Sequence, residues 1–311
     1  MISGLPFDDF RNLATLLPPL DSAAAKVATG LAAGRAGRLL GWFSGATGRP
    51  PQVVSPQVAI FAGTHGAFER LAAGTAQRTQ AIVDRYGSGG TALNRACASA
   101  DFGLKVFDLA LDVPTGDFTV EPALDERGCA ATMAFGMEAV AGGTDLLVLG
   151  SLAEGGDAPA SALLSVLLEE SIRPAANASL VDEALSAHHG HLGDPLEAMR
   201  RLGGREIAAL AGAILAARME RVAIILDGLP ALAAAAAIKA LAPEGIAHCI
   251  LADRGDGAQR RVSELLGMEF LLDLGQEDGT AGVLAASMLK TLGQTYFAGS
   301  WPIAPAPPRR H

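Results

Sequence analysis

Short apolar runs alternate with longer stretches of helical composition from about residue 57 onward. The runs are continuous rather than alternating, and most are rich in β-branched residues or leucine. Such runs are typical of strands buried on both faces of a parallel sheet, and the stretches between them predict crossover helices. The sequence therefore predicts an α/β fold with a doubly wound, mostly parallel sheet. The predicted strands are residues 57–62, 103–111, 144–152, 221–229, 248–252 and 269–274. The predicted helices are residues 67–86, 125–141, 160–170, 206–217, 229–241, 259–266 and 280–292.

The two ends of the chain and one internal segment lack this pattern. Residues 1–50 predict helices that are broken at Pro18-Pro19 and at residues 45–51, and residues 171–204 contain no strand signal. The C-terminal end is too proline-rich to fold by itself. We expect residues 1–50 to be part of a small helical subdomain, residues 51–295 to form a Rossmann-like α/β domain, and residues 296–311 to be a tail.

Composition and charge exclude several classes of protein. Hydrophobic residues make up 50% of the chain, yet no apolar run approaches the roughly 18 to 20 residues of a membrane span. The net charge is −9, which makes a nucleic-acid backbone a poor partner. The N-terminus carries acid and proline where a signal peptide requires a basic and then an apolar segment. We therefore expect a soluble cytoplasmic protein that binds neither membrane nor nucleic acid.

Cysteine and histidine spacing gives little indication of a metal. The three cysteines are widely separated and form no CxxC pair, so reduced thiols are expected. Three histidines lie close together, and their spacing allows a metal site or a solvated loop. Their glycine neighbours favour the loop, so we expect no metal and no other cofactor. These residues are Cys97, Cys129, Cys249, His188, His189 and His191.

Glycine-rich or acidic loops follow four of the predicted strands. The carboxyl ends of parallel strands meet at one edge of a sheet, where glycine lets a ligand approach backbone N–H groups and helix N-termini attract anions. Phosphate is therefore a natural ligand, although neither a P-loop nor a dinucleotide fingerprint is present. Each loop can equally be purely structural. The four loops are residues 63–66, 150–157, 227–228 and 275–280.

Several blocks of the chain resemble the nicotinate-nucleotide–dimethylbenzimidazole phosphoribosyltransferase family. The resemblance extends from about residue 57 to about residue 292. Its longest block is residues 194–214, Asp-Pro-Leu-Glu-Ala-Met-Arg-Arg-Leu-Gly-Gly-Arg-Glu-Ile and the following apolar helix. Shorter blocks are Val-Ala-Ile-Phe-Ala-Gly-Thr-His-Gly at 58–66, Gly-Gly-Thr-Ala-Leu-Asn at 89–94, Thr-Gly-Asp-Phe-Thr-Val-Glu-Pro-Ala-Leu at 115–124 and Ile-Leu-Asp-Gly at 225–228.

This resemblance implies a fold, a reaction and a set of site residues. The implied fold is a six-stranded parallel sheet with helices on both faces and a small helical subdomain, usually in a homodimer. In the implied reaction, a carboxylate removes the N–H proton of a benzimidazole-type base, which attacks the anomeric carbon of nicotinate mononucleotide and expels nicotinate. Aligning Gly279-Thr280 puts Asp278 on the position of the family's catalytic glutamate, with Glu277 beside it. The implied substrate-binding residues are Thr64, His65, Gly66, Gln80, Ser151, Glu154, Gly155, Gly156, Asp227, Gly279 and Thr280.

The residues themselves leave two of these roles open. His65 follows a buried strand, so it can contact a ligand or stabilise its own loop by a hydrogen bond. Asp227 can line the cleft or cap the helix that is predicted to start near Pro230.

The chain departs from the family pattern where the chemistry is expected. The family's Gly-Glu-Met-Gly-Ile-Gly-Asn-Thr-Thr is Gly-Ser-Leu-Ala-Glu-Gly-Gly-Asp-Ala at residues 150–158. Ser151 replaces the glutamate, and Asp157 introduces a negative charge where the family receives a phosphate. The family's lysine is missing from the shortened segment at 171–186, where Arg173 is the only cation.

Two functions are therefore predicted. The first is transfer of phosphoribose from nicotinate mononucleotide to a benzimidazole-type base, which forms α-ribazole phosphate for the nucleotide loop of cobalamin. Its partners are small molecules, a nucleotide monophosphate and an azole base. The second is that of a non-catalytic homologue that binds a ligand or a partner in cobamide metabolism.

Overall fold

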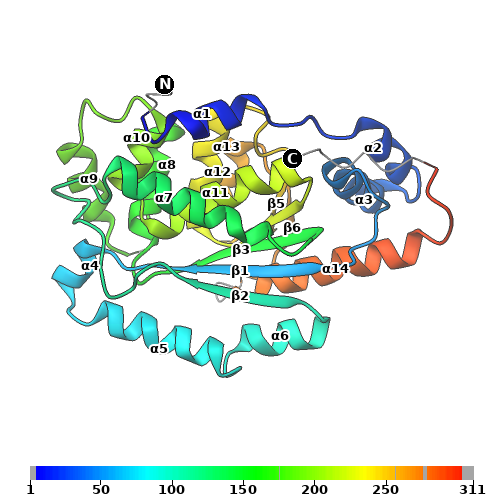
Figure 1. The fold of residues 1–311 in the computed structure, drawn as a ribbon, viewed down its shortest axis with the longest axis horizontal. Coiled ribbons are helices and arrows are strands. Elements are labelled where there is room, and N and C mark those ends of the chain that lie inside the picture. The colour runs from blue at the N-terminus through cyan, green and yellow to red at the C-terminus, as the bar shows by residue number, and fades with distance from the viewer. Residues whose placement is uncertain (1–4, 175, 256, 276–278, 303–311) are drawn as a thin grey trace.

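A six-stranded, fully parallel sheet forms the centre of the molecule, in the order β2-β1-β3-β4-β5-β6 (Figure 1). The computed structural model describes residues 5–174, 176–255, 257–275 and 279–302. All six predicted strands are present, and the predicted α/β class with a doubly wound parallel sheet is confirmed. The strands are β1 Pro56–Ala62, β2 Gly103–Asp108, β3 Leu146–Leu152, β4 Ala223–Leu226, β5 Cys249–Asp253 and β6 Phe270–Leu272.

The inner strands have apolar residues on both faces because helices cover both faces. In β3, Leu147 and Leu149 belong to the core on one face, whereas Leu146 and Val148 belong to the core on the other. This alternation follows from the period of two along a strand, and it explains why the strands appear as continuous apolar runs. The edge strand β2 differs, since none of its residues is fully buried.

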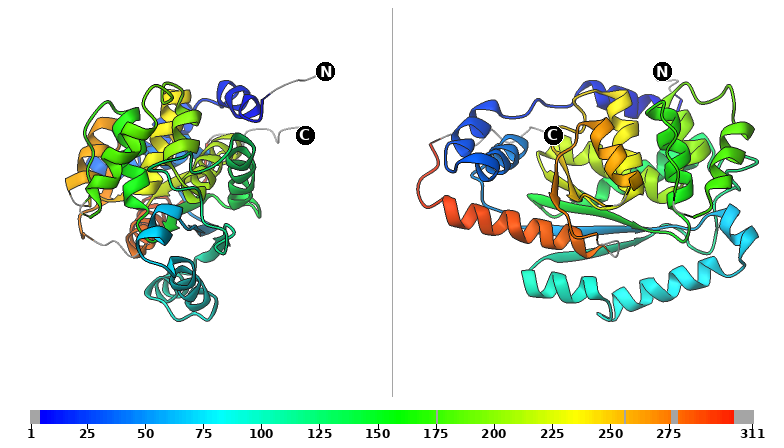
Figure 2. Two further views of the ribbon diagram at one scale, coloured as in Figure 1. Left: turned by 90° about the vertical axis from the view of Figure 1, so that its left-hand side faces the viewer. Right: turned by 180° about the vertical axis from the view of Figure 1, so that it is seen from behind.

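One face of the sheet carries the larger layer of helices, and the other face carries α3, α6 and α14 (Figure 1). In the larger layer, α11 packs between α7 and α12, and α8 packs against α12. The helices α5 and α6 lie along the outer side of β2 (Figures 1 and 2). The helices of the larger layer are α7 Glu126–Gly136, α8 Asp157–Leu167, α10 Pro195–Leu202, α11 Arg205–Glu220, α12 Leu229–Leu241 and α13 Gly257–Leu266. The others are α1 Asp8–Thr15, α2 Ser22–Thr29, α3 Gly34–Thr47, α4 Gly66–Leu71, α5 Thr75–Gly87, α6 Ala92–Ala100, α9 Ala178–Ala187, α14 Thr280–Tyr296 and the 3-10 helix η1 Met137–Val140.

The helices differ from the prediction in three places. The helix predicted at 67–86 is two helices, because Gly74 has a left-handed backbone (φ 88°) that interrupts the α-helical path. Helix α6 is absent from the predicted set, although Thr91 and Asn94 form a capping box at its start. The segment at 171–204 contains α9 and α10, and its lack of strand signal reflects helix rather than loop.

The N-terminal helices lie in two places. Phe7 and Phe10 belong to the core that also contains α12, so α1 packs on the larger helical layer. Helices α2 and α3 pack on each other, and Leu39 and Phe43 of α3 join the opposite core. The division of the chain into a small subdomain, an α/β domain and a tail stays a prediction.

No helix among the described residues is both long enough and apolar enough to cross a membrane.

Candidate active site

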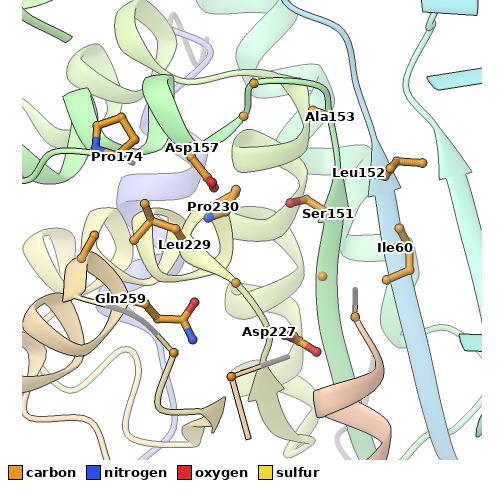
Figure 3. A pocket seen from close by; sticks show the side chains of 18 of the residues that line it. Ile60, Ser151, Leu152, Ala153, Asp157, Pro174, Asp227, Leu229, Pro230 and Gln259 are labelled. Atoms are coloured by element: carbon orange, nitrogen blue, oxygen red, sulfur yellow. The ribbon is translucent and has the colours of Figure 1, made fainter. Parts of the chain in front are cut away.

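A cavity of about 570 Å³ opens at the carboxyl ends of the strands (Figure 3). The chain reverses the direction of strand order between β1 and β3, and ligands of open α/β sheets bind at such a switch point. Ile60 of β1 and Ser151 and Leu152 of β3 lie on one side of the cavity, and Asp227 lies at the end of β4 (Figure 3). The full lining is Ile60, Tyr86, Gly150, Ser151, Leu152, Ala153, Gly155, Gly156, Asp157, Pro174, Asp227, Gly228, Leu229, Pro230, Gly255, Ala258, Gln259, Gly275 and Gly279.

Three of the four loops expected at this edge contribute to the lining, as does a further segment that the sequence reasoning missed. The loops after β3, β4 and β6 all supply lining residues, whereas the loop at 63–66 supplies none. The missed segment follows β5 and contributes Gly255, Ala258 and Gln259. The signal that could have found it is the Asp-Arg-Gly-Asp-Gly turn at 253–257, which has the same composition as the other loops.

The loop after β3 turns sharply into α8. Gly155 has a left-handed backbone (φ 76°), and a Cβ there would lie 2.2 Å from the ring of Phe68. Only glycine fits at position 155. Gly155 and Gly156 both line the cavity. Ser151 lies beside Phe61 in the register of β1 and β3 and lines the cavity. Asp157 is the first residue of α8, and its side chain extends toward the cavity on the side of Pro230 (Figure 3).

Glu154 is not among the lining residues and forms an ion pair instead. It is 41% exposed and pairs with Arg78 of α5, with Arg78 Nε 2.7 Å from its Oε2 and Arg78 Nη2 2.9 Å from its Oε1. This bidentate hydrogen bonding raises the pKa of Arg78 above its ordinary value. Glu154 therefore ties α5 to the loop, and it is not among the residues that line the cavity.

Asp227 lines the cavity and also caps helix α14. Two roles were left open for Asp227, and the structure places it in the cavity lining, whereas helix α12 starts at Leu229 without a side-chain cap. The backbone N–H of Gly282, in the first turn of α14, donates to Asp227 Oδ2 at 2.7 Å instead. A Cβ at Gly282 would lie 2.3 Å from Val148 Cγ1, so the helix approaches β3 closely enough for this contact.

A carboxylate at the end of β5 holds the backbone that directly follows β6. Asp253 is buried and accepts hydrogen bonds from the N–H groups of Leu274, Gly255 and Gly275, at 2.8, 2.9 and 3.2 Å. Gly279 lines the cavity and is followed by Thr280, the first residue of α14. The two residues predicted to act as the base, Glu277 and Asp278, lie outside the described residues.

The loop after β1 makes contacts within the protein and does not line the cavity. Thr64 is buried, and its hydroxyl donates to the carbonyl of Leu111 at 3.0 Å. A Cβ at Gly66 would lie 2.3 Å from the carbonyl oxygen of Thr115, so glycine is needed for close packing there. On α5, the side-chain amide of Gln80 donates to Asp84 at 2.9 Å. Thr64, Gly66 and Gln80 are not among the cavity-lining residues, and their roles in substrate binding stay predictions.

A buried pair beneath the loop escaped the sequence reasoning. His65 Nε2 lies 2.9 Å from Glu206 Oε1, and both side chains are fully buried. Burial acts to raise the pKa of Glu206, but attraction to His65 and their close polar contact outweigh it and lower that pKa. A Cβ at Gly63 would lie 2.6 Å from Glu206 Oε2, and one at Gly204 would lie 2.5 Å from the same atom. The acid at the start of an otherwise apolar helix, after two glycines, is the signal that could have found it.

The remaining candidates are not among the residues that line the cavity. Arg173 pairs with Asp182 at 2.5 Å. His188 is buried, with Nε2 3.0 Å from the carbonyl of Phe118, so it does not belong to the solvated loop that was expected for it. All three cysteines are buried and unpaired, and burial raises the pKa of each thiol. Within the described part of the chain, no group of three His, Cys, Asp or Glu side chains could hold a metal ion.

The parallel sheet and the cavity at its carboxyl edge define the class of open-sheet α/β proteins, and comparison with known families narrows this class. Residues 22–296 match the family described as Phosphoribosyltransferase. The match covers most of the chain, so the protein belongs to this phosphoribosyltransferase family.

Relatives of known name specify the family further. The chain is 47% identical to the nicotinate-nucleotide–dimethylbenzimidazole phosphoribosyltransferase of Rhizobium meliloti (strain 1021), over 93% of each chain. It is 44% identical to the protein of the same name from Allorhizobium ampelinum (strain ATCC BAA-846 / DSM 112012 / S4), over 95% of this chain and 94% of the relative. The chain therefore belongs to the nicotinate-nucleotide–dimethylbenzimidazole phosphoribosyltransferase family.

A crystal structure supports the same fold. The enzyme of this name from Thermus thermophilus superposes with a TM-score of 0.77 at 24% identity, over 93% of this chain and 94% of that one.

Proposed function

We propose that this protein transfers phosphoribose from nicotinate mononucleotide to a benzimidazole-type base in the cavity, forming α-ribazole phosphate for the nucleotide loop of cobalamin. The observation that carries the proposal is the 47% identity, over 93% of each chain, to a relative named for this reaction. The cavity supports it, since about 570 Å³ lies within the range of about 300–1,000 Å³ typical of small-molecule sites.

The proposed step is a displacement at the anomeric carbon. One azole nitrogen attacks this carbon, the bond from the carbon to the pyridinium nitrogen breaks, and nicotinate leaves with the electron pair. The N–H proton of the azole passes to a carboxylate, for which we propose Asp278 or its neighbour Glu277 on the turn before α14. The step requires neither a redox partner nor a metal, and we propose that the protein uses no cofactor.

An activity assay tests the proposal directly. The protein is incubated with nicotinate mononucleotide and 5,6-dimethylbenzimidazole, and nicotinate and the new nucleotide are quantified by chromatography. We expect release of both products, and we expect Asp278→Asn or Glu277→Gln to lower the rate by roughly a hundredfold or more, as loss of a general base does. Asp273→Asn is the matched control, because Asp273 is an exposed acid of the same segment that pairs with Arg254. Absence of nicotinate release above background, with several azoles, would overturn the proposal.

A second candidate function rests on the charge of the cavity lining. No lysine, arginine or histidine occurs among the described lining residues, whereas Asp157 and Asp227 do. The negative charge of this lining is consistent with a protein that binds a ligand in the cavity but does not catalyse its conversion. Calorimetric binding of the azole or the nucleotide, with no product formed, is the result that distinguishes this function from catalysis.

We further propose that the protein is cytoplasmic and forms a homodimer. The family resemblance is the support for the dimer, and light scattering after size-exclusion chromatography tests it. A mass near twice 31.7 kDa supports the dimer, and a mass near 31.7 kDa contradicts it.

A further inference from the structure

A buried pair of titratable side chains lies directly behind one wall of the cavity. His65 Nε2 is 2.9 Å from Glu206 Oε1, and both side chains are fully buried. We infer that this pair positions the Gly155–Gly156 part of the cavity wall and thereby sets the affinity for the nucleotide donor. The inference rests on the proposed phosphoribosyl transfer and goes beyond it in assigning two positioning residues, neither of which is among the residues that line the cavity.

The carboxylate of Glu206 is enclosed by the backbone of three segments. An added Cβ would lie 2.6 Å from Glu206 Oε2 at Gly63, after β1, and 2.5 Å from the same oxygen at Gly204, before α11. At Gly156, which follows β3 and lines the cavity, an added Cβ would lie 3.7 Å from Glu206 Oε1. One buried carboxylate therefore contacts the cavity wall from the protein side and joins it to two other segments.

The segment that carries His65 also supports the neighbouring glycine of the wall. Gly155 has a left-handed backbone (φ 76°), and a Cβ there would lie 2.2 Å from the ring of Phe68. The rings of Phe68 and His65 lie edge to face, with their centroids 6.4 Å apart. Residues 65–68 thus place an aromatic ring against Gly155, while His65 holds the carboxylate that contacts Gly156.

Packing alone does not require charged groups behind this wall. Burial of a carboxylate is costly, and apolar side chains of similar volume often replace a buried ion pair without loss of stability. A close polar contact, however, fixes the distance and the direction between two groups more narrowly than apolar packing does. The pair therefore holds the start of α11 and the loop after β1 in one relative position, and this position determines where the wall at Gly156 lies.

The nucleotide donor is the ligand that this wall suits by its chemistry. Gly156 is the residue that precedes α8, and a glycine turn that leads into a helix binds phosphate through backbone N–H groups. Such contacts depend steeply on geometry, since a misplacement of about 1 Å can cost on the order of a hundredfold in rate. A displaced wall should therefore weaken the binding of the nucleotide more than that of the azole.

Titration calorimetry on the full-length protein tests the inference without requiring turnover. The titrants are nicotinate mononucleotide and 5,6-dimethylbenzimidazole, and urea denaturation shows whether each variant is folded. Glu206→Met removes the contact with His65, and we expect the Kd for the nucleotide to rise about tenfold, with a smaller change for the azole. Glu206→Gln retains an oxygen that accepts from His65, so its Kd should stay within about threefold of wild type. Where transfer occurs, the KM for the nucleotide should rise with the Kd, whereas kcat should change less.

Two further variants separate positioning from folding. Asp145 is buried at the amino end of β3, away from the cavity, and accepts from the N–H groups of Val54 and Ser55 at 2.6 and 3.0 Å. Asp145→Ala should therefore lower stability and leave the Kd unchanged. The double variant His65→Leu with Glu206→Met replaces the pair by apolar side chains, so it should fold even where Glu206→Met does not. We expect it to bind the nucleotide about tenfold more weakly than wild type.

The outcomes keep this inference apart from the proposed function. Weaker nucleotide binding in Glu206→Met or the double variant, with no transfer by the wild type, supports the inference and refutes the proposed transfer. Transfer with an unchanged Kd and KM in these variants overturns the inference and leaves the proposed transfer intact. A rise in Kd for Asp145→Ala or Glu206→Gln as large as that for Glu206→Met also overturns the inference, because the contact with His65 would then not be its cause. Absence of nucleotide binding by the wild type overturns both.

Discussion

At the residue scale, the carboxylates around the cavity divide into those that hold the protein together and those that line the cavity itself. Asp253 accepts hydrogen bonds from three backbone N–H groups, and Glu206 lies beside His65 with both side chains fully buried. Both acids follow or adjoin strand ends, where sequence reasoning places catalytic groups. Their surroundings indicate a supporting role, because a buried carboxylate requires partners to offset its desolvation.

Removal of Glu206 tests this supporting role. Glu206→Ala leaves His65 without its partner and opens a void beside Gly63 and Gly204, so we expect a loss of about 3 kcal/mol in the free energy of unfolding. Urea denaturation measures it. Glu264→Ala is the control, since Glu264 is exposed and its change should stay within about 0.5 kcal/mol. Equal stability of the two variants would show that the pair contributes nothing.

At the scale of elements, the carboxyl end of β4 organises the start of α14. Asp227 reaches across 55 residues of sequence to the N–H of Gly282, and Gly282 lets the helix approach Val148. The predicted catalytic turn ends at this same helix start. Capping by Asp227 therefore couples the start of α14 to the sheet.

Substitution of Asp227 tests this coupling. Asp227→Ala removes the acceptor for the Gly282 N–H, and we expect a loss of about 1–2 kcal/mol in unfolding free energy, as for other helix caps. Asp227→Asn retains an oxygen acceptor and should cost markedly less. Hydrogen exchange followed by NMR should show faster exchange of the Gly282 amide in the alanine variant only. Equal protection of this amide in both variants would contradict the cap.

At the scale of the whole molecule, the fold was predictable and the polar contacts of the site were not. Six apolar runs sufficed to predict the sheet, because burial on both faces leaves a continuous pattern in the sequence. The cavity at the strand ends could be anticipated for the same reason. The pairing of His65 with Glu206 joins residues 141 positions apart (206 − 65), and the cap from Asp227 joins different elements. Such partners are fixed by packing in three dimensions, which local composition does not specify.

One buried histidine should make the free energy of unfolding of the whole molecule depend on pH. His248 is fully buried between β5 and α11, with Nε2 3.1 Å from the carbonyl of Ile214. Burial and the nearby charge of Arg218 lower the pKa of His248 from 6.5 to about 3. Below pH 6.5 this histidine binds a proton in the unfolded state but remains neutral in the folded state. Its contribution to the free energy of unfolding is therefore fully present above pH 6.5 and is lost as the pH falls toward 3.

The expected slope follows from that linkage. Between about pH 6 and pH 4, His248 should reduce the unfolding free energy by about 1.4 kcal/mol per pH unit. Urea denaturation across this range, on wild type and on His248→Gln, measures the contribution as a difference of slopes. The glutamine amide can still donate to Ile214, so the variant should fold and show the flatter dependence. His189→Gln is the matched control, because His189 is exposed and its loss should leave the slope unchanged. Identical slopes in wild type and His248→Gln would mean that His248 takes up its proton in the folded protein as readily as in the unfolded chain.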